Sequence, residues 1–199
     1  MRLTALRPAS HRGFRLNSGR VYLRAPQQSD WRAWSELREE SRAFLTAWEP
    51  TWPHDALTRS AFRRRVRAYD REWQQSSGYS FLVLLRQDDT VLGGITLTNL
   101  RRGVAQSISL GYWIGSRYAR QGYMTEALQA ALEFCFEDLG LHRVEAACLP
   151  NNQASKGLLI KSGFREEGYA RQFLRINGRW QDHVLFAILR DEWRKASKG

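Results

Sequence analysis

The sequence contains few cysteines and no long apolar run, and each absence excludes a class of protein. The two cysteines, Cys135 and Cys148, have neither the spacing of a metal site nor that of a disulfide framework. We expect both to be small buried side chains in a reducing cytoplasm, without zinc or disulfide chemistry. No stretch approaches the roughly 18 apolar residues of a membrane-spanning helix, so we expect no membrane partner.

Acidic residues are absent from the first 29 positions, in which six arginines occur. Such a start can resemble an organelle transit peptide. Strand-like segments at 14–16 and 21–23 nevertheless indicate that folded structure begins by Phe14, and residues 1–13 are predicted to be a basic, flexible segment. The formal net charge of +11 implies attraction to acidic partners, without choosing among phosphorylated cofactors, RNA and anionic membranes.

The composition is that of one globular domain spanning residues 1–199. With 43% hydrophobic residues the chain is long enough to bury a full core. Strand-like patterns occur at 21–25, 79–86, 91–100, 105–115, 142–149, 164–176 and 179–189. Helical spacing occurs from about 29 to 44, 58 to 73, 123 to 139 and 151 to 162. This order predicts an α/β sandwich built on a mixed sheet.

In the stretch 112–125 a predicted strand runs into a predicted helix through a short basic loop. The first backbone N–H groups of a helix have no intrahelical acceptor, and Arg117 and Arg120 add positive charge to that of the helix dipole. Gly122 lets the backbone approach a ligand closely. The arrangement favours an anion, and a pyrophosphate fits it. The alternative is an ordinary turn between a strand and a helix.

This loop resembles the pyrophosphate loop of the GCN5-related N-acetyltransferases, whose pattern is Gln/Arg-x-x-Gly-x-Gly/Ala. The aligned residues run from Ala119 to Met124, with Gly122 at the central glycine. Ala119 replaces the usual Gln or Arg, and this departure puts one phosphate contact in doubt. A second family motif follows at the expected spacing, with the members Asn152, Ser155, Gly163 and Phe164.

Blocks on both sides of these motifs resemble one branch of the family, the ribosomal-protein-alanine N-acetyltransferases of the small-subunit type. They are Trp48-Glu49-Pro50 and the C-terminal block around Asn177-Gly178. The likeness covers about residues 14–190. It implies the family's α/β fold, with a mixed and mostly antiparallel sheet, helices on both faces and one splayed parallel strand pair.

The resemblance also implies acetyl-CoA as the acetyl donor, bound between the two parallel strands. In this fold the backbone of one strand pairs with the pantetheine arm, and amides of the loop hold the pyrophosphate. An asparagine at the start of the next helix can hydrogen-bond the pantetheine. The cofactor-binding residues implied in this way are Trp113, Ile114, Arg120, Gln121, Gly122, Tyr123, Met124, Thr125, Asn152 and Ser155.

Acetyl transfer needs a proton for the leaving thiolate and a neutral amine. Many relatives have a tyrosine, which acts as the acid, at the position of Leu159. The resemblance implies that Ser155 takes over this role. The alternative is that the Ser155 hydroxyl, at the start of a helix, only hydrogen-bonds the backbone. As general base we consider Glu49 first, because its loop should border the acceptor, and then Glu145, which could be a structural strand residue. An α-amine has a pKa of about 7.7–8.0, so a strong base can be unnecessary. His183 could assist or be structural.

Together these features predict an enzyme that uses acetyl-CoA to acetylate the α-amine of the N-terminal alanine of a ribosomal protein. One alternative is a small-molecule amine as acceptor, such as an amino acid or an aminoglycoside. The other is a basic protein that binds RNA or the ribosome and has a relic acetyltransferase fold. Its support is the arginine-rich helix at 58–73, which presents either a solvated face or a surface for ribosomal RNA. We expect a cytoplasmic monomer or homodimer.

Overall fold

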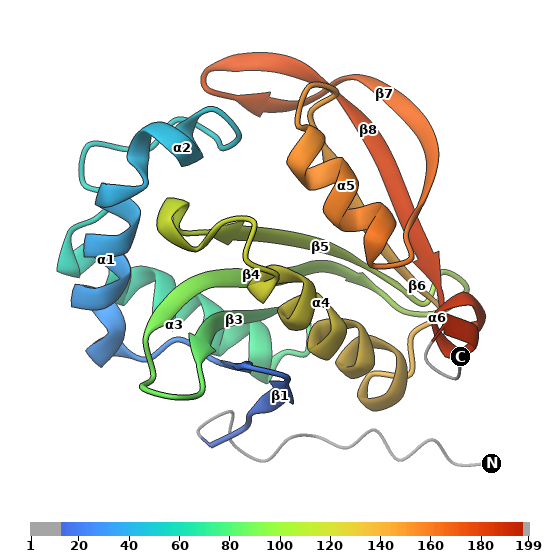
Figure 1. Cartoon of the computed structure of the whole chain (residues 1–199), viewed down its shortest axis with the longest axis horizontal. Helices are drawn as coiled ribbons and strands as arrows, with labels where there is room; N and C mark the ends of the chain where they lie inside the picture. Colours follow the sequence, from blue (N-terminus) through green and yellow to red (C-terminus); the bar gives the residue numbers. More distant parts are fainter. Residues whose placement is uncertain (1–12, 197–199) are drawn as a thin grey trace.

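One sheet of eight strands organises the fold, in the order β1-β2-β3-β4-β5-β6-β8-β7 (Figure 1). The computed structural model describes residues 13–196, so the predicted basic segment lies outside the described residues apart from Gly13. The strands are β1 (Leu16–Ser18), β2 (Val21–Arg24), β3 (Tyr79–Leu85), β4 (Val91–Arg101), β5 (Ser107–Ile114), β6 (Arg143–Cys148), β7 (Arg165–Ile176) and β8 (Arg179–Leu189). The α-helices are α1 (Trp31–Glu40), α2 (Arg42–Thr46), α3 (Arg59–Gln74), α4 (Tyr123–Glu133), α5 (Gln153–Lys161) and α6 (Arg190–Ala196). Shorter helical turns are η1 (Gln28–Asp30), η2 (Ser116–Tyr118) and the π-helical η3 (Phe134–Asp138).

Strands β5 and β6 run parallel, whereas the other neighbouring strands of the described chain are antiparallel. The parallel pairing involves only Ser107 to Ser109 of β5, although β5 continues to Ile114 and β6 continues to Cys148. The two strands therefore separate toward their carboxyl ends. This confirms the predicted mixed sheet with a splayed parallel pair. In open α/β sheets, ligands bind beyond the carboxyl ends of the strands.

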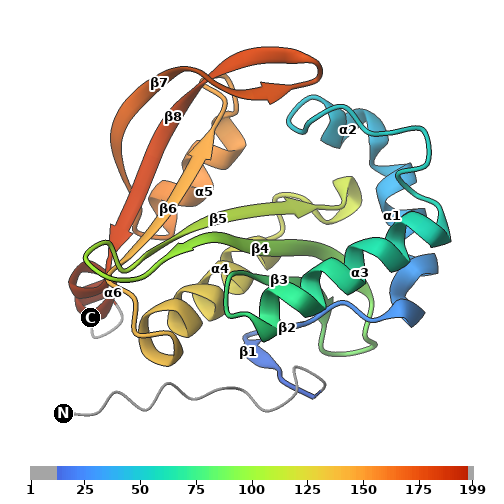
Figure 2. The ribbon, with the colours of Figure 1, turned by 180° about the vertical axis from the view of Figure 1, so that it is seen from behind.

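Helices cover both faces of the sheet, as predicted. Helices α4 and α5 lie in front of it in Figure 1, and α3 lies in front in the reverse view of Figure 2. Because apolar residues recur every three or four positions in α3, one side of that helix is buried. Phe62 and Val66 of α3 share a buried cluster with Leu82 and Leu84 of β3 and with Trp34 of α1.

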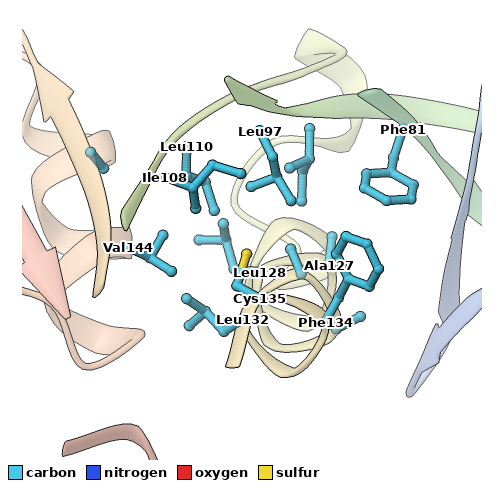
Figure 3. Close-up of a cluster of buried hydrophobic side chains, with 14 of the residues drawn as sticks. Phe81, Leu97, Ile108, Leu110, Ala127, Leu128, Leu132, Phe134, Cys135 and Val144 are labelled. Atoms are coloured by element: carbon cyan, nitrogen blue, oxygen red, sulfur yellow. The ribbon is translucent and has the colours of Figure 1, made fainter. Parts of the chain in front are cut away.

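Helix α4 fills the opposite side of the sheet. Figure 3 shows its side chains, among them Leu128, directed at Leu97 of β4 and Ile108 of β5. All three are fully buried. Cys135 is also fully buried, which agrees with the expected small buried side chain, and burial raises the pKa of its thiol. Truncation of such buried leucines costs about 2–5 kcal/mol, so α4 and the loop before it are held firmly on the sheet.

Three helical features differ from the sequence prediction. The helix expected over 29–44 is broken at Ser41, whose buried hydroxyl accepts the N–H of Ser116 at 2.9 Å. The helix expected to run to 139 is α-helical only to Glu133 and then continues as the π-helical η3. The pattern does not predict α6. At Ser41, the contact with the distant Ser116 interrupts a helix that the regular apolar spacing predicts to continue.

Candidate active site

The loop between β5 and α4 exposes the start of a helix. Gly122 precedes the first turn of α4 with φ +87° and ψ −11°, and Arg120 also has a positive φ of 61°. No described side chain caps this end of α4. The backbone N–H groups of Tyr123, Met124 and Thr125 therefore have no intrahelical acceptor and carry the positive end of the helix dipole. The geometry fits the predicted anion site.

Arg20, in the turn between β1 and β2, holds this loop in place. Its backbone N–H and its guanidinium both donate to Glu126 of α4, at 2.6–2.8 Å, and the guanidinium also donates to the carbonyl of Gln121 at 2.9 Å. It lies 4.3 Å from the centre of the Tyr123 ring. The sequence prediction missed this contact, because the partners lie more than 100 residues apart and no local pattern joins them.

The start of the loop is held by the broken helix. The N–H of Ser116 donates to Ser41, and the two hydroxyls lie 3.3 Å apart. Trp113 and Ile114, just before this point, pair with Gly94 and Gly93 of β4 on one edge. Their other edge faces the gap, because β6 no longer pairs with β5 there. An extended ligand arm can add to that edge as a strand would.

Tyr112 and Ser155 meet across this gap. The Tyr112 hydroxyl and the Ser155 Oγ are hydrogen-bonded at 2.7 Å, which joins β5 to the first turn of α5. Burial raises the pKa of Tyr112 to about 12, so its phenol stays protonated at neutral pH. The sequence prediction included Ser155 but missed Tyr112. The strand pattern contains Tyr112 but gives no reason to select it.

Asn152 is the N-cap residue of α5 and lies three positions before Ser155. Its Oδ1 accepts the backbone N–H of Ser155 at 3.0 Å. The cap uses the side-chain oxygen, and the amide N–H₂ group is the donor that a pantetheine carbonyl would need. The cap and the predicted cofactor contact are therefore compatible.

Glu49 is engaged by two neighbours. It forms an ion pair with the buried Arg38 of α1, and its Oε2 accepts the indole N–H of Trp52 at 2.7 Å. The Arg38 guanidinium lies over the rings of Trp52 and Trp113, at 4.3 and 4.8 Å from their centres. These contacts favour a positioning role for Glu49 over that of a proton acceptor. Its role as a base stays a prediction.

The other candidate bases have structural partners. Glu145 pairs with Arg101 and Arg143 on the surface of the sheet. His183 is 3% exposed, and its Nδ1 lies 3.0 Å from the carbonyl oxygen of Gln181. Both arrangements correspond to the structural alternatives that the sequence leaves open.

A pocket of about 570 Å³ lies beside the end of β6. One wall is the hairpin β7–β8, which reaches toward α2 (Figure 1). Near the hairpin tip, the N–H of Asn177 donates to the carbonyl of Glu49 at 3.1 Å, which joins the two sequence blocks that resemble the ribosomal branch. The pocket is lined by Ala47, Leu149, Pro150, Asn151, Tyr169, Ile176, Asn177, Arg179, Gln181 and Asp182.

Asp182 is the acidic residue among the described residues that line this pocket. It accepts the backbone N–H of Gln172 at 2.8 Å and the hydroxyl of Tyr169 at 2.7 Å. The backbone hydrogen bond from Gln172, followed by that from Tyr169, lowers the pKa of Asp182. The side chain is therefore ionised at neutral pH.

Comparison with known proteins assigns the chain to a family. The family model of the acetyltransferase (GNAT) domain matches residues 20–165, and the chain belongs to this family. The chain is accordingly an N-acetyltransferase that uses acetyl-CoA. Each helix within residues 13–196 is too short or too polar to span a bilayer.

Individual relatives cover nearly the whole chain. The probable N-acetyltransferase YjcK of Bacillus subtilis is 32% identical over 169 residues, which make up 85% of this chain and 93% of that protein. The ribosomal protein uS5-alanine N-acetyltransferase of Escherichia coli is 33% identical over 180 residues, 90% of this chain and 92% of that protein. The structure of Mycobacterium smegmatis RimJ in complex with CoA-disulfide matches with a TM-score of 0.83 and 32% identity, covering 90% of this chain and 87% of that one. The chain is thus similar to ribosomal protein acetyltransferases.

Proposed function

We propose that this enzyme acetylates the N-terminal α-amine of alanine in a protein of the small ribosomal subunit. The observation that carries the proposal is the contact between Asn177, which lines the pocket, and Glu49, because it joins the two blocks that resemble the ribosomal branch beside that pocket. The similarity to the alanine N-acetyltransferase of Escherichia coli supports the same acceptor. Because ribosomal proteins are assembled on RNA, contact with ribosomal RNA is part of the proposal.

The charge of the pocket supports a peptide over a polycationic amine. Among its described lining residues, Asp182 is the acidic side chain and Arg179 the basic one. An aminoglycoside carries several ammonium groups and would require several carboxylates to neutralise them. A peptide N-terminus carries one, and its backbone can hydrogen-bond the polar wall.

The described residues can hold acetyl-CoA at the gap between β5 and β6. The amides of Tyr123, Met124 and Thr125 would bind the diphosphate. The free edge of Trp113 and Ile114 would pair with the pantetheine arm, toward which Asn152 would donate. Bound in this way, acetyl-CoA supplies an activated acetyl thioester.

Ser155 and Tyr112 supply the proton that the reaction needs. We assign proton donation to Ser155, because its hydroxyl lies at the gap and is oriented by Tyr112. Tyr112 is protonated at neutral pH, so it can return a proton to Ser155 and then regain one from solvent. The acceptor α-amine is partly neutral near pH 7–8, so water can carry its proton away without a dedicated base.

A thiol-release assay with mass spectrometry tests the acceptor. The acceptors are a small-subunit peptide that begins with alanine, the same peptide with a blocked N-terminus, and a set of aminoglycosides and amino acids. We expect acetylation of the free alanine peptide alone. Turnover of a small amine with none on the peptide would overturn the proposal and favour the small-molecule alternative.

A further inference from the structure

Helix α3 presents a row of arginines to solvent. Arg63, Arg67 and Arg71 are exposed and follow one another at four-residue spacing, and we call these three residues the α3 arginine row. Four residues advance an α-helix by about 6 Å, so the guanidinium groups start from regularly spaced points along one side. The adjoining side of α3 is fixed in the core by Phe62 and Val66. The packing of α3 therefore keeps the three arginines on the solvent side of the helix.

The row differs from the other arginines of α3 in the partners that its charges have within residues 13–196. No carboxylate of residues 13–196 forms an ion pair with any of its three members. In contrast, Arg64 pairs with Asp55 at 2.6 Å, and Arg59 and Arg65 lie over the rings of Trp31 and Trp34. Within the described residues, three positive charges on one helix thus lack an ion-paired carboxylate, and this arrangement favours an external polyanion.

The chemistry of the row fits a phosphodiester backbone. Arginine binds phosphate through two parallel N–H groups, and a regular row matches a regular series of single negative charges. The row itself has no apolar side chain to insert into lipid, which a membrane-bound helix would have. We propose that the α3 arginine row binds the phosphate backbone of folded RNA next to the acceptor protein, so that the enzyme docks on an assembled ribosomal particle. This inference rests on the proposed function.

The position of α3 leaves the catalytic groups accessible during such docking. Helix α3 covers the sheet face opposite to α4 and α5, as Figures 1 and 2 show from the two sides. The anion-binding loop that precedes α4 therefore stays open to acetyl-CoA. Substitutions in the row are far from the Tyr112–Ser155 pair in the fold and should leave the chemistry itself intact.

A salt series with a fluorescein-labelled RNA hairpin tests the docking. The row variant carries Arg63→Gln, Arg67→Gln and Arg71→Gln, and glutamine keeps the helix propensity. The control variant removes the same charge from exposed, ion-paired arginines through Arg32→Gln, Arg165→Gln and Arg194→Gln. We expect the slope of log affinity against log salt to fall by about 2 to 3 in the row variant and to stay unchanged in the control. Equal losses in both variants would overturn the inference.

Acetylation of two substrates tests the consequence. On unacetylated small ribosomal subunits we expect kcat/KM of the row variant to fall on the order of tenfold, while its rate on a free alanine peptide stays that of the wild type. Equal rates on the particle would contradict docking. If the wild type acetylated neither substrate while RNA affinity still depended on the row, the proposed acceptor would be wrong and the RNA surface would stand. Binding to phosphatidylserine vesicles that depends on the row, without RNA binding, would assign it to a membrane instead.

Discussion

The hydroxyl of Tyr112 lies 2.7 Å from the Oγ of Ser155, where β5 and β6 have already separated. One group comes from the strand that borders the cofactor gap and the other from the helix after the next strand. Tyr112 can therefore orient the Ser155 hydroxyl and resupply its proton. The pair connects the splay of the sheet with the chemistry that we assign to it.

Replacing Ser155 removes the proposed acid. We expect Ser155→Ala to lower kcat by about 100-fold or more, the usual contribution of general acid catalysis. Tyr112→Phe should lower kcat less, by about tenfold, because Ser155 remains. Ser162→Ala, at the other end of α5, is the matched control and should keep the wild-type rate. Steady-state kinetics decide, and a wild-type kcat in Ser155→Ala would remove the serine from the mechanism.

Tyr112 should also affect stability at alkaline pH. Its pKa is raised by burial from 10.0 in the unfolded chain to about 12 in the fold. The stabilisation from the buried neutral phenol is therefore fully present below pH 10 and is lost as the pH rises through 12. Relative to Tyr112→Phe, which does not titrate, the wild type should lose free energy of unfolding between pH 10 and 12. Urea unfolding of both proteins over this range measures the difference, and a constant difference would contradict the assigned pKa.

Local patterns predicted the parts of the fold that depend on neighbouring residues. The alternation in 105–115 and the helical spacing after Tyr123 place the loop between β5 and α4 correctly, and Asn177-Gly178 marks the hairpin turn that the structure shows. The splayed parallel pair followed from the family resemblance. These features need only the period of the side chains, a turn signal or a shared motif.

Contacts between distant residues account for what the sequence did not reveal. The break at Ser41 depends on Ser116, and the position of the loop depends on the pair of Arg20 and Glu126. A carboxylate such as Glu49 can be selected as a candidate base from its loop, but the ion pair that engages it comes from Arg38 on a helix. Periodicity does not encode which side chains meet across a fold. The sequence therefore predicts which segments border the candidate site, but not which of their side chains pair with one another.

The ion pair of Arg38 and Glu49 allows the base and positioning roles of Glu49 to be separated. If Glu49 positions the wall of the pocket, Glu49→Gln should raise the KM of the peptide acceptor several-fold and leave kcat within about threefold, because the chemistry does not use its charge. A base would show the reverse, with a loss of kcat of about 100-fold or more. Glu39→Gln is the control, since Glu39 pairs with Arg42 at the surface. Peptide kinetics at saturating acetyl-CoA measure both constants.

Gly122 and Gly140 offer a matched test of the anion site. Both glycines have a positive φ, 87° and 65°, and they flank the segment formed by α4 and η3. Alanine at either position should cost about 1 kcal/mol or more of folding free energy, because a side chain is strained in this conformation. Only Gly122→Ala should also weaken coenzyme A binding, by about tenfold, since relief of the strain turns the amides of Tyr123 and Met124 away from the diphosphate.

Gly122→Asp should weaken coenzyme A binding further, because its carboxylate repels the negatively charged diphosphate. Titration calorimetry with coenzyme A, beside thermal unfolding, separates the two effects. Equal coenzyme A affinities for Gly122→Ala and Gly140→Ala would mean that the diphosphate does not bind at the start of α4.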